Sequence, residues 1–259
     1  MNRVSAANLC LTAVEGLPLV APGDDLAALI DTALNDQGIV LEEGDCLILA
    51  QKIVSKAEDR YCYLNRLEVS DAARDLAQKI DKEPALCQAI LDESVRVVRH
   101  RPGAVIVEHR LGYVHANAGI DRSNIESDDH NPRVLLLPLD PDGSAARLRE
   151  QLSQRSGVAP MIIINDSAGR PFRNGTHGFA IGTAGFEPLE NRIGDQDLFG
   201  RELEVTEVAV ADELAAAASL LMGQAGESVP LVHARGLKLR SSDAGSKALI
   251  RDAAKDLFR

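Results

Sequence analysis

The segment that decides the fold is Met161–Gly182, "MIIINDSAGRPFRNGTHGFAIG", in which an apolar run stops at Asn165 and Asp166. The run is short and rich in β-branched residues, and a polar stretch with several Gly and Arg residues follows it. This pattern predicts a buried strand over 161–164 and then a loop. A carboxylate directly after a strand is most often an Asx turn or a helix cap, so the local pattern favours a turn role for Asp166.

A second aspartate occupies a similar setting. Asp121, in "HANAGIDRSN", also follows small and apolar residues and precedes polar ones. Carboxylates with hydroxyl or amide oxygens nearby are hard ligands suited to Mg²⁺ or Mn²⁺, and two such ions can clamp a phosphoryl group during its transfer. Both interpretations stay open at this point, because a turn or a cap would place the same residue type after each segment.

The composition is that of an acidic globular protein. The chain has 259 residues, 45% of them hydrophobic, and a formal net charge of −11 at pH 7. This length allows one large domain or two modest ones. Aromatic residues make up 3% and Trp is absent, which disfavours stacking platforms for single-stranded nucleic acid. An acidic surface repels phosphate backbones and anionic lipid, so we expect no nucleic-acid partner and no membrane partner.

Cysteine usage and the start of the chain indicate a cytoplasmic protein. Cys10, Cys46, Cys62 and Cys87 are unevenly spaced, without the two-residue gap of a zinc knuckle or a redox pair. We expect buried thiols in a reducing compartment. The N-terminus lacks the order of a signal peptide, since Glu15 interrupts its apolar run, and no run of about 18 apolar residues occurs.

Apolar periodicity predicts an α+β fold with a mixed sheet or sheets and flanking helices. Strands are predicted over 9–14, 47–50, 104–107, 134–137 and 161–164, with a further strand-like segment over 229–236. Helices are predicted over 24–38 with Asp24 as N-cap, 70–93 with a break at Pro84, 144–157, 212–223 and 243–258. We expect a single domain over 1–259, with two subdomains as an option whose boundary falls at 125–133.

Familiar nucleotide motifs are missing from the sequence. No two glycines are separated by one residue, and no Gly is followed by Lys and then Ser or Thr, which excludes the dinucleotide fingerprint and the Walker A loop. Other segments could cradle an anion, namely the turn Glu15–Pro18, the polar positions Lys52, Ser55 and Lys56, and the loop that starts at Gly223. Each also has a plain structural interpretation, as a connection, a solvated surface or a helix stop.

Covalent catalysis lacks support in the sequence. No Ser or Cys sits in a nucleophile elbow, and the six histidines show no metal-ligand spacing. His177, inside the first quoted segment, could contact a substrate, although a histidine in a loop is more often solvated.

Taken in chain order, these segments resemble one family, the coenzyme F-420-0:L-glutamate ligases, which attach glutamate to the precursor of a deazaflavin cofactor. The stretches that carry the resemblance are "VEGLPLV", "VSKAE", "NAGIDRSN", "NDSAGRPFR" with "AIGTAG", "DLFGRELEVTEVAVADELAAAASLLMGQ" and "VPLVHARG". They are collinear over nearly the whole chain, which is far more specific than any one motif. The resemblance implies a family-specific ligase fold and an intertwined homodimer.

The resemblance also implies which residues form the site. The residues implied in GTP binding are Gly16, Leu17, Pro18, Leu19, Lys56, Asn124, Met222, Gly223, Gln224, Ala225, Gly226, Glu227, Ser228 and Val229. The residues implied as metal ligands are Asp121, Asp166, Ser167 and Gln224, and the two aspartates are also the implied catalytic residues. The implied ions are Mg²⁺ or Mn²⁺, two per site, with K⁺ as a further candidate.

In such a ligase, GTP phosphorylates the carboxylate of the deazaflavin precursor to an acyl phosphate, and the amino group of L-glutamate displaces phosphate to give an amide. A further γ-linked glutamate can follow. This chemistry needs positioned reactants and neutralised charge rather than a nucleophilic side chain. The implied partners are therefore GTP, L-glutamate, the deazaflavin precursor and a second copy of the chain.

The sequence departs from the family pattern at three places. Ser167 stands where Thr is usual and keeps the hydroxyl, while Gln51 and Lys52 replace a Ser-Thr pair near the nucleotide. Residues 175–178, "GTHG", replace a segment that usually contains Gly-Gln-Thr. These changes leave the acceptor and the preference for GTP open. The alternatives are the same acyl-phosphate chemistry on a different carboxylate and a non-catalytic nucleotide-binding protein.

Two arginines in the first quoted segment are candidates for substrate binding. Arg170 and Arg173 could bind the phosphodiester of the precursor or the carboxylates of glutamate, since guanidinium groups pair well with both. A purely structural role is an equal alternative.

Overall fold

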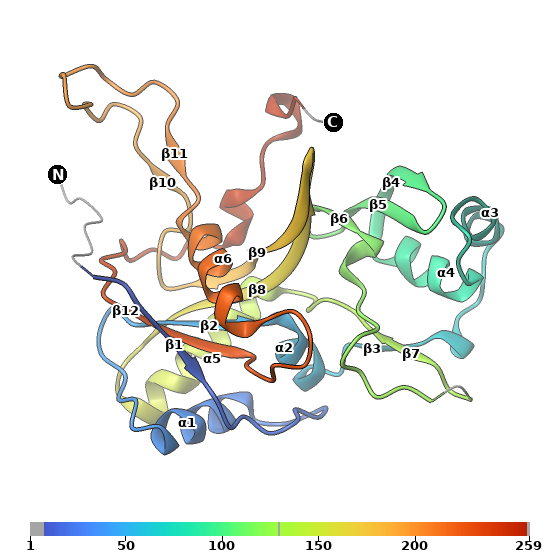
Figure 1. Cartoon of the computed structure of the whole chain (residues 1–259), viewed down its shortest axis with the longest axis horizontal. Helices are drawn as coiled ribbons and strands as arrows, with labels where there is room; N and C mark the ends of the chain where they lie inside the picture. Colours follow the sequence, from blue (N-terminus) through green and yellow to red (C-terminus); the bar gives the residue numbers. More distant parts are fainter. Residues whose placement is uncertain (1–7, 129, 258–259) are drawn as a thin grey trace.

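A mixed five-stranded sheet forms the centre of the protein (Figure 1). The structure, a computed structural model, describes residues 8–128 and 130–257. The strands of this sheet follow the order β1 (Cys10–Val14), β12 (Leu231–Arg235), β2 (Cys46–Ala50), β8 (Met161–Arg170) and β9 (Arg173–Ala184). Within it β2 and β8 run parallel, and the other neighbouring pairs are antiparallel. The predicted α+β class is confirmed.

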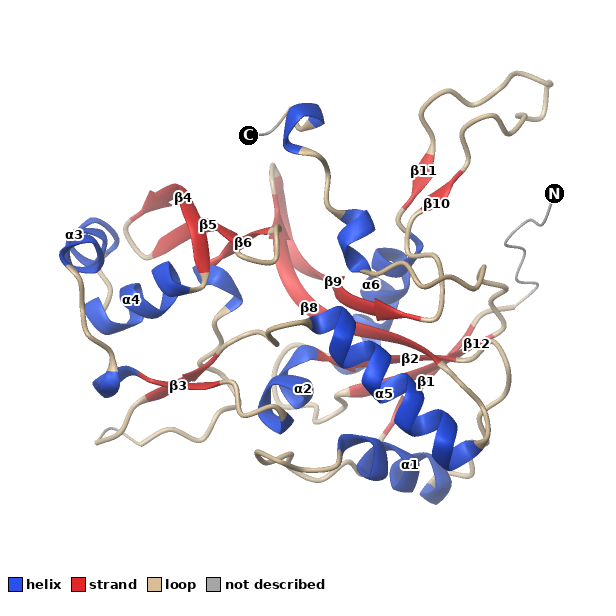
Figure 2. Ribbon diagram, turned by 180° about the vertical axis from the view of Figure 1, so that it is seen from behind, coloured by secondary structure: helices blue, strands red, loops and turns tan. Residues whose placement is uncertain are grey.

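Helices cover both faces of this sheet. Figure 1 shows α6 (Val210–Met222) in front of it, and Figure 2 shows α1 (Leu26–Asp36) and α5 (Pro141–Ser156) on the opposite face. Along β2, Leu47 packs into the core with α1 and α5, whereas Ile48 packs into the core with α6. The two-residue period of a strand thus gives each face its own apolar layer. No helix among the described residues is long and apolar enough to span a lipid bilayer.

Residues 61–135 form a lobe beside the sheet, called the helical lobe from here on (Figure 1). It has its own apolar core, which includes Leu76, Ile90 and Val107. Its elements are β3 (Tyr61–Tyr63), a 3-10 turn (Leu64–Arg66), α3 (Asp71–Ile80), α4 (Pro84–Asp92), β4 (Ser94–Arg101), β5 (Ala104–His109), β6 (Val114–Ala116), a 3-10 turn (Asn117–Gly119) and β7 (Arg133–Leu135). The predicted subdomain boundary at 125–133 stays a prediction, and residue 129 lies outside the described residues.

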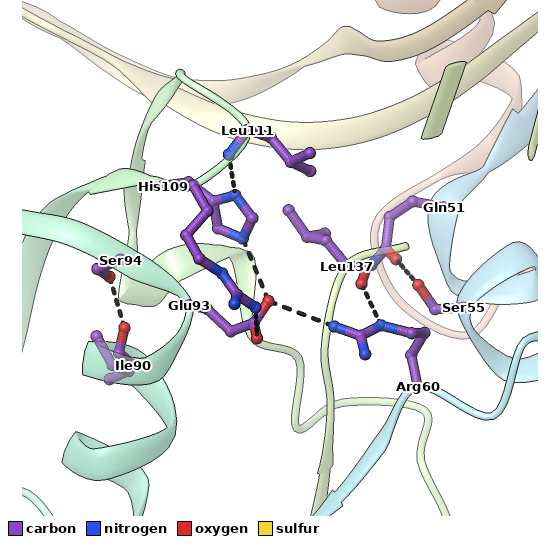
Figure 3. Close-up of polar contacts among 10 residues, drawn as sticks. Gln51, Ser55, Arg60, Ile90, Glu93, Ser94, His109, Leu111 and Leu137 are labelled. Atoms are coloured by element: carbon purple, nitrogen blue, oxygen red, sulfur yellow. Dashed lines mark hydrogen bonds and ion pairs between the residues drawn. The ribbon is translucent and has the colours of Figure 1, made fainter. Parts of the chain in front are cut away.

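A buried carboxylate ties the helical lobe to the chain that enters and leaves it (Figure 3). Glu93 follows α4, and its carboxylate contacts the guanidinium groups of Arg110 and of Arg60, the latter at 3.4 Å. Nε of Arg60 also donates to the carbonyl of Leu137 at 2.8 Å. One carboxylate therefore joins α4 to the segments on either side of the lobe.

The same partners keep Glu93 ionised. Nδ1 of His109 accepts the N–H of Leu111 at 3.0 Å, so Nε2, which lies 3.7 Å from the Glu93 carboxylate, carries the proton. Burial raises the pKa of Glu93, but the contacts with His109 and the two arginines outweigh it, and that pKa lies below its ordinary value.

The strand that starts at Met161 is longer than predicted. β8 continues to Arg170 and pairs with β9 in a hairpin, where the sequence predicts a loop after Ile164. Asp166 therefore lies inside a strand, opposite Phe179, and the predicted turn role is wrong. Antiparallel pairing satisfies the backbone hydrogen bonds of this hairpin whatever its side chains are. The hairpin extends beyond the apolar core, so its polar residues do not show the apolar pattern by which strands are recognised in a sequence.

The segment after β2 also differs from the prediction. It forms helix α2 (Gln51–Ala57), whereas the sequence predicts no helix between residues 38 and 70. Ile53 and Val54 are buried on this helix. Their β-branched side chains favour a strand locally, but burial against the core overrides that preference.

The predicted helix over 243–258 is absent from the described part of that segment, and Phe258 lies outside the described residues. Two 3-10 turns, Ser246–Leu249 and Ala253–Lys255, replace it. Oδ1 of Asp142 accepts the N–H groups of Ser246 and Thr183 at 2.8 Å each. This side chain anchors the segment to the end of β9 and favours an extended path over a helix.

Two local predictions need smaller corrections. The N-cap of α1 is Asp25, whose Oδ1 accepts the N–H of Ala28 at 2.9 Å, while Asp24 caps the preceding turn. Cys46 and Cys87 are buried and Cys62 is half-buried, but Cys10 is exposed because it opens the edge strand β1. α5 ends at Ser156 with Gly157 as its C-cap, close to the predicted end, but it begins at Pro141 rather than at residue 144.

A second arm extends away from the sheet (Figure 1). Its two short strands are β10 (Glu190–Asn191) and β11 (Glu207–Val208), which pair antiparallel. Leu198, Phe199 and Val205 of this arm are exposed at 93, 95 and 85%.

Glu93→Gln should lower the free energy of unfolding by about 3 kcal/mol, because it leaves Arg60 and Arg110 without their buried counter-charge. Denaturant unfolding followed by circular dichroism measures this difference. Glu68→Gln, at an exposed position of the same lobe, is the matched control and should change that free energy by less than about 0.5 kcal/mol. Equal, small effects of the two substitutions would contradict the structural role of Glu93.

The stabilisation by Glu93 should also depend on pH with a defined sign. Because its pKa is lower in the folded protein than in the unfolded chain, the contribution is present above pH 4.5 and is lost as the pH falls through the folded-state pKa. Glu93→Gln has no group that titrates there. The difference in unfolding free energy between the parent and this variant should therefore shrink from about pH 6 to about pH 3, and a constant difference would count against it.

Candidate functional site

Four chain segments meet at one edge of the central sheet. The parallel strands β2 and β8 are paired as far as Ala50 and Asn165, and the same edge holds the end of β1 at Val14 and the start of β12 at Leu231. A cleft of about 540 Å³ opens there. Ligands of open α/β sheets bind outside the carboxyl ends of the strands, so this edge is the expected place for a site.

Most residues that the sequence singles out line this cleft. Those that line it are Leu17, Pro18, Leu19, Lys56, Asn124, Asp166, Ser167, Met222, Gly223, Gln224, Ala225, Gly226, Ser228 and Val229. Gly16, Asp121 and Glu227 are not among the lining residues. Asp121 instead contacts Gln51 and Lys52, which line the cleft. The fold thus brings together segments from both ends and the middle of the chain, while the individual binding roles stay predictions.

Asp166 faces the cleft because of where β2 ends. β2 stops at Ala50 and the chain turns into α2, whereas β8 continues past Asn165 with β9 as its ladder partner. A register shift between Ile164 and Asn165 marks the transition. Asp166 and Ser167 therefore lie beside the free edge of β8 and line the cleft.

A histidine of the helical lobe contacts Asp166. Nε2 of His115 lies 3.1 Å from Oδ2 of Asp166, and Nδ1 lies 2.9 Å from the carbonyl of Ala116. Burial lowers the pKa of His115, but the hydrogen bond and the charge of Asp166 outweigh it and raise that pKa. The sequence does not single out His115, because its six-residue separation from His109 is not a known ligand spacing.

Asp121 is the second carboxylate of the site. Its backbone N–H and C=O exchange hydrogen bonds with Leu135 at 2.9 and 3.0 Å, which fixes its place beside β7. Oδ2 accepts from Nε2 of Gln51 at 2.6 Å, and Oδ1 lies 3.4 Å from Nζ of Lys52. Burial raises the pKa of Asp121 to about 6, with Lys52 opposing the shift and the charge of Asp166 adding to it.

The amide of Gln51 is held in one orientation. Gln51 and Ser55 are both buried on α2, and Oγ of Ser55 donates to Oε1 of Gln51 at 2.8 Å (Figure 3). The amide nitrogen is therefore directed to Asp121. One of the departures from the family pattern thus places a fixed donor on a proposed metal ligand.

Lys56 and Asn124 link α2 to the loop that follows α6. Nζ of Lys56 donates to the carbonyl of Asn124 at 2.8 Å, and Nδ2 of Asn124 donates to the carbonyl of Ala225 at 2.9 Å. Burial, then the charges of Lys52 and Arg133, lower the pKa of Lys56. Two lysines thus line the cleft and lie within electrostatic reach of each other, which favours an anionic ligand there.

The loop after α6 has a shape that requires glycine at its start. Gly223 has φ 70° and ψ −173°, a combination that is confined to glycine. The carboxylate of Glu227 lies against it, so a Cβ at this position would overlap that carboxylate. Oε2 of Glu227 also accepts the N–H of Ala225 at 2.7 Å. The carboxylate of Glu227 therefore stabilises the conformation of the loop through its contacts with Gly223 and Ala225.

The donor atoms at the site fit a hard divalent cation. The carboxylates of Asp121 and Asp166 interact electrostatically, and Ser167 and Gln224 add a hydroxyl and an amide at the same cleft. Mg²⁺ and Mn²⁺ prefer such oxygen ligands, and Mg²⁺ is often held by one or two carboxylates together with substrate phosphates. Among the described residues no three His, Cys, Asp or Glu side chains gather into a metal site, so substrate or water oxygens would complete the coordination.

Three other candidates lie outside the cleft lining. Arg170 and Arg173 pair across the tip of the β8–β9 hairpin and are exposed. His177 is half-buried, with Nδ1 2.7 Å from the carbonyl of Gly178. A ligand that reached these residues would extend along the hairpin from Ser167, and their roles stay predictions.

Comparison with known proteins gives matches over nearly the whole chain. The sequence profile of the family described as F420-0:Gamma-glutamyl ligase matches residues 16–236, which include every candidate site residue. The chain is 48% identical to the Coenzyme F420:L-glutamate ligase of Methanothermobacter thermautotrophicus, over 97% of this chain and 99% of that protein. It is 45% identical to the protein of the same name from Methanopyrus kandleri, over 95% and 97%, and 42% identical to that from Archaeoglobus fulgidus, over 95% and 94%.

Gln51→Leu should lower the free energy of unfolding by about 2 kcal/mol, because it removes the hydrogen bonds to Asp121 and Ser55 while it keeps a side chain of similar size. Denaturant unfolding measures this change. Gln78→Leu, at an exposed position of α3, is the matched control and should stay within about 0.5 kcal/mol of the parent. A Gln51→Leu protein as stable as the parent would show that the directed amide contributes nothing.

Proposed function

The chain belongs to the F420-0:gamma-glutamyl ligase family, and on this premise we propose that it joins coenzyme F420-0 to the amino group of L-glutamate through an amide bond, with GTP as phosphoryl donor. The family resemblance seen in the sequence is confirmed, and with it the ligase class. Addition of a further γ-linked glutamate is an extension of the same chemistry.

The observation that carries this proposal is that Asp166, Lys52 and Lys56 line one cleft, while Asp121 contacts Lys52 beside it. Asp121 comes from the helical lobe and Asp166 from the sheet, and the charge of Asp166 helps to raise the pKa of Asp121. Lys52 and Lys56 come from α2 and line the same cleft. This combination suits a nucleoside triphosphate with its divalent cation, because the lysines compensate phosphate charge and the carboxylates hold the cation.

The proposed reaction has two steps. A carboxylate oxygen of coenzyme F420-0 forms a bond to the γ-phosphorus of GTP, the bond from that phosphorus to the β–γ bridging oxygen breaks, and GDP leaves. The amino group of L-glutamate then attacks the acyl carbon, and the bond from that carbon to the phosphate oxygen breaks. Inorganic phosphate leaves, and the nitrogen releases a proton. No nucleophilic side chain is needed, so positioning and charge are the tasks of the protein.

The residues of the chain would bind and orient these reactants. Lys56, the turn at 16–19 and the loop 222–229 would hold GTP, and His115 would keep Asp166 in one orientation. Bound Mg²⁺ or Mn²⁺ supplies neutralisation of the charge on the transferring phosphoryl group. The side chains proposed to hold two such ions are those of Asp121, Asp166, Ser167 and Gln224, with K⁺ as a further candidate ion.

A homodimer is part of the same proposal. The β10–β11 arm extends from the sheet (Figure 1) and exposes Leu198, Phe199 and Val205. Large apolar side chains grouped on one exposed segment mark an interaction surface. A second copy of the chain is the partner that the family resemblance implies.

The direct test supplies the purified protein with GTP, Mn²⁺, L-glutamate and coenzyme F420-0 and follows the product by mass spectrometry. We expect a gain of one or more glutamyl residues, with one phosphate released per amide bond. When ¹⁸O is placed in the carboxylate of coenzyme F420-0, the label should appear in inorganic phosphate, because that oxygen leaves with the phosphoryl group. Unlabelled phosphate would contradict the acyl phosphate, and turnover only with another carboxylate would reassign the acceptor. GTP binding without any turnover would indicate a nucleotide-binding protein.

Asp166→Asn should lower kcat for amide formation by at least about 100-fold, because the amide keeps the shape of the side chain but removes its charge from the cleft. Continuous assay of phosphate release gives this ratio. Asp36→Asn, exposed at the end of α1, is the matched control and should retain the parent rate. An Asp166→Asn rate within about twofold of the parent would exclude a role for this carboxylate in phosphoryl transfer.

A further inference from the structure

The ammonium group of Lys52 and the proposed cation compete for the same carboxylate. Nζ of Lys52 lies 3.4 Å from Oδ1 of Asp121 and donates to Oγ of Ser123 at 3.1 Å. Gln51 donates to the other oxygen, Oδ2, at 2.6 Å. Both carboxylate oxygens of Asp121 are therefore engaged, and the positive charge of Lys52 repels a cation that approaches this carboxylate.

Lys52 is the partner that is easier to displace. Gln51 is 2% exposed, and its amide is held by the buried hydroxyl of Ser55 (Figure 3). The side chain of Lys52 is 28% exposed, and its Nζ lies 3.4 Å from Oδ1 of Asp121. The ammonium group is carried on a flexible four-carbon chain. A partly exposed ion pair of this kind contributes little to stability. Binding of a cation would therefore move Lys52 and leave Gln51 in place.

A displaced Lys52 has an evident new partner in the cleft. Lys52 and Lys56 are four residues apart on α2, so they lie on the same side of the helix, and both line the cleft. The charge of Lys52 already contributes to the lowered pKa of Lys56, which places the two ammonium groups within electrostatic reach. Without Asp121 as its counter-ion, Lys52 would need an anion, and a phosphate group beside Lys56 would supply it.

We propose that Lys52 is an internal counter-ion of Asp121 that a divalent cation replaces, and that its ammonium group then binds a phosphate oxygen of the nucleotide. This inference rests on the proposed function, since it requires a cation at Asp121 and a nucleotide in the cleft. In the free protein Lys52 is a positioning residue, which holds the carboxylate in place. The exchange also couples the two ligands, because the nucleotide stabilises the displaced lysine and so favours the cation.

Two substitutions of Lys52 separate this role from a structural one. Lys52→Met removes the ammonium group and keeps an apolar stem, whereas Lys52→Arg keeps the charge. Calorimetric titration of Mn²⁺ into the nucleotide-free protein measures the competition directly. We expect Lys52→Met to bind Mn²⁺ about 10-fold more tightly than the parent, and Lys52→Arg to stay within about threefold of it.

Nucleotide binding gives a second readout of opposite sign. In the presence of Mn²⁺, the affinity for a GTP analogue with an imido group between the β- and γ-phosphates should fall about 10-fold in Lys52→Met. A variant that is merely misfolded would bind both ligands more weakly, and circular dichroism checks the fold. Lys79→Met, on α3 outside the cleft and ion-paired to Asp75, is the matched control and should change neither affinity.

The outcomes distinguish this inference from the proposed function. Mn²⁺ binding by the parent that is unchanged or weaker in Lys52→Met would overturn the exchange and leave the ligase proposal standing. Absence of Mn²⁺ binding from the parent would overturn the metal site of the proposed function and this inference with it. Tighter Mn²⁺ binding together with weaker nucleotide binding would support the exchange.

Discussion

The parallel register of β2 and β8 is the constraint on which the site depends. The two strands are paired as far as Ala50 and Asn165, and beyond that level one chain turns into a helix while the other continues as a hairpin. This difference leaves Asp166 at a free edge and places the start of α2 beside it. A shift of the register by one residue would turn Asp166 toward α6, because successive side chains of a strand point to opposite faces.

The helical lobe supplies the other half of the site, so its docking on the sheet matters as much as that register. It contributes Asp121 and His115, and the contact of His115 with Asp166 closes the interface at 3.1 Å. Beside this contact, the ring of Tyr113 stacks on the ring of His109, with 5.5 Å between the ring centroids. The same ring packs edge-on against Phe179 of β9, with 5.7 Å between the centroids. The ionic cluster around Glu93 and the cleft are thus joined by packed rings. The spacing of the two proposed metal ligands depends on this packing, since Asp121 follows Ile120, which packs in the core of the helical lobe, whereas Asp166 follows Ile164 of the sheet core by two residues.

Sequence patterns predict the parts of this fold that an apolar core organises. The strands at 47–50 and 104–107 and the helices α3 to α6 follow from periodicity, caps and breaks, because burial of one face enforces a period. The β8–β9 hairpin and α2 are not predicted from the sequence, because they form through long-range strand pairing and burial rather than through local conformational preference. The contacts of Gln51 with Asp121 and of His115 with Asp166 are not predicted either, because they too depend on long-range structure. Each joins residues at least fifty positions apart, and only the collinear family motifs point to the cleft in advance.

The most direct measurement of the central claim is steady-state phosphate release from GTP with each co-substrate supplied alone and with both together. We expect sustained release only when coenzyme F420-0 and L-glutamate are both present. Coenzyme F420-0 alone should give at most a single turnover, because the acyl phosphate then waits for an amine. Equal release with either co-substrate alone, or no release with both, would contradict a glutamate ligase at this cleft.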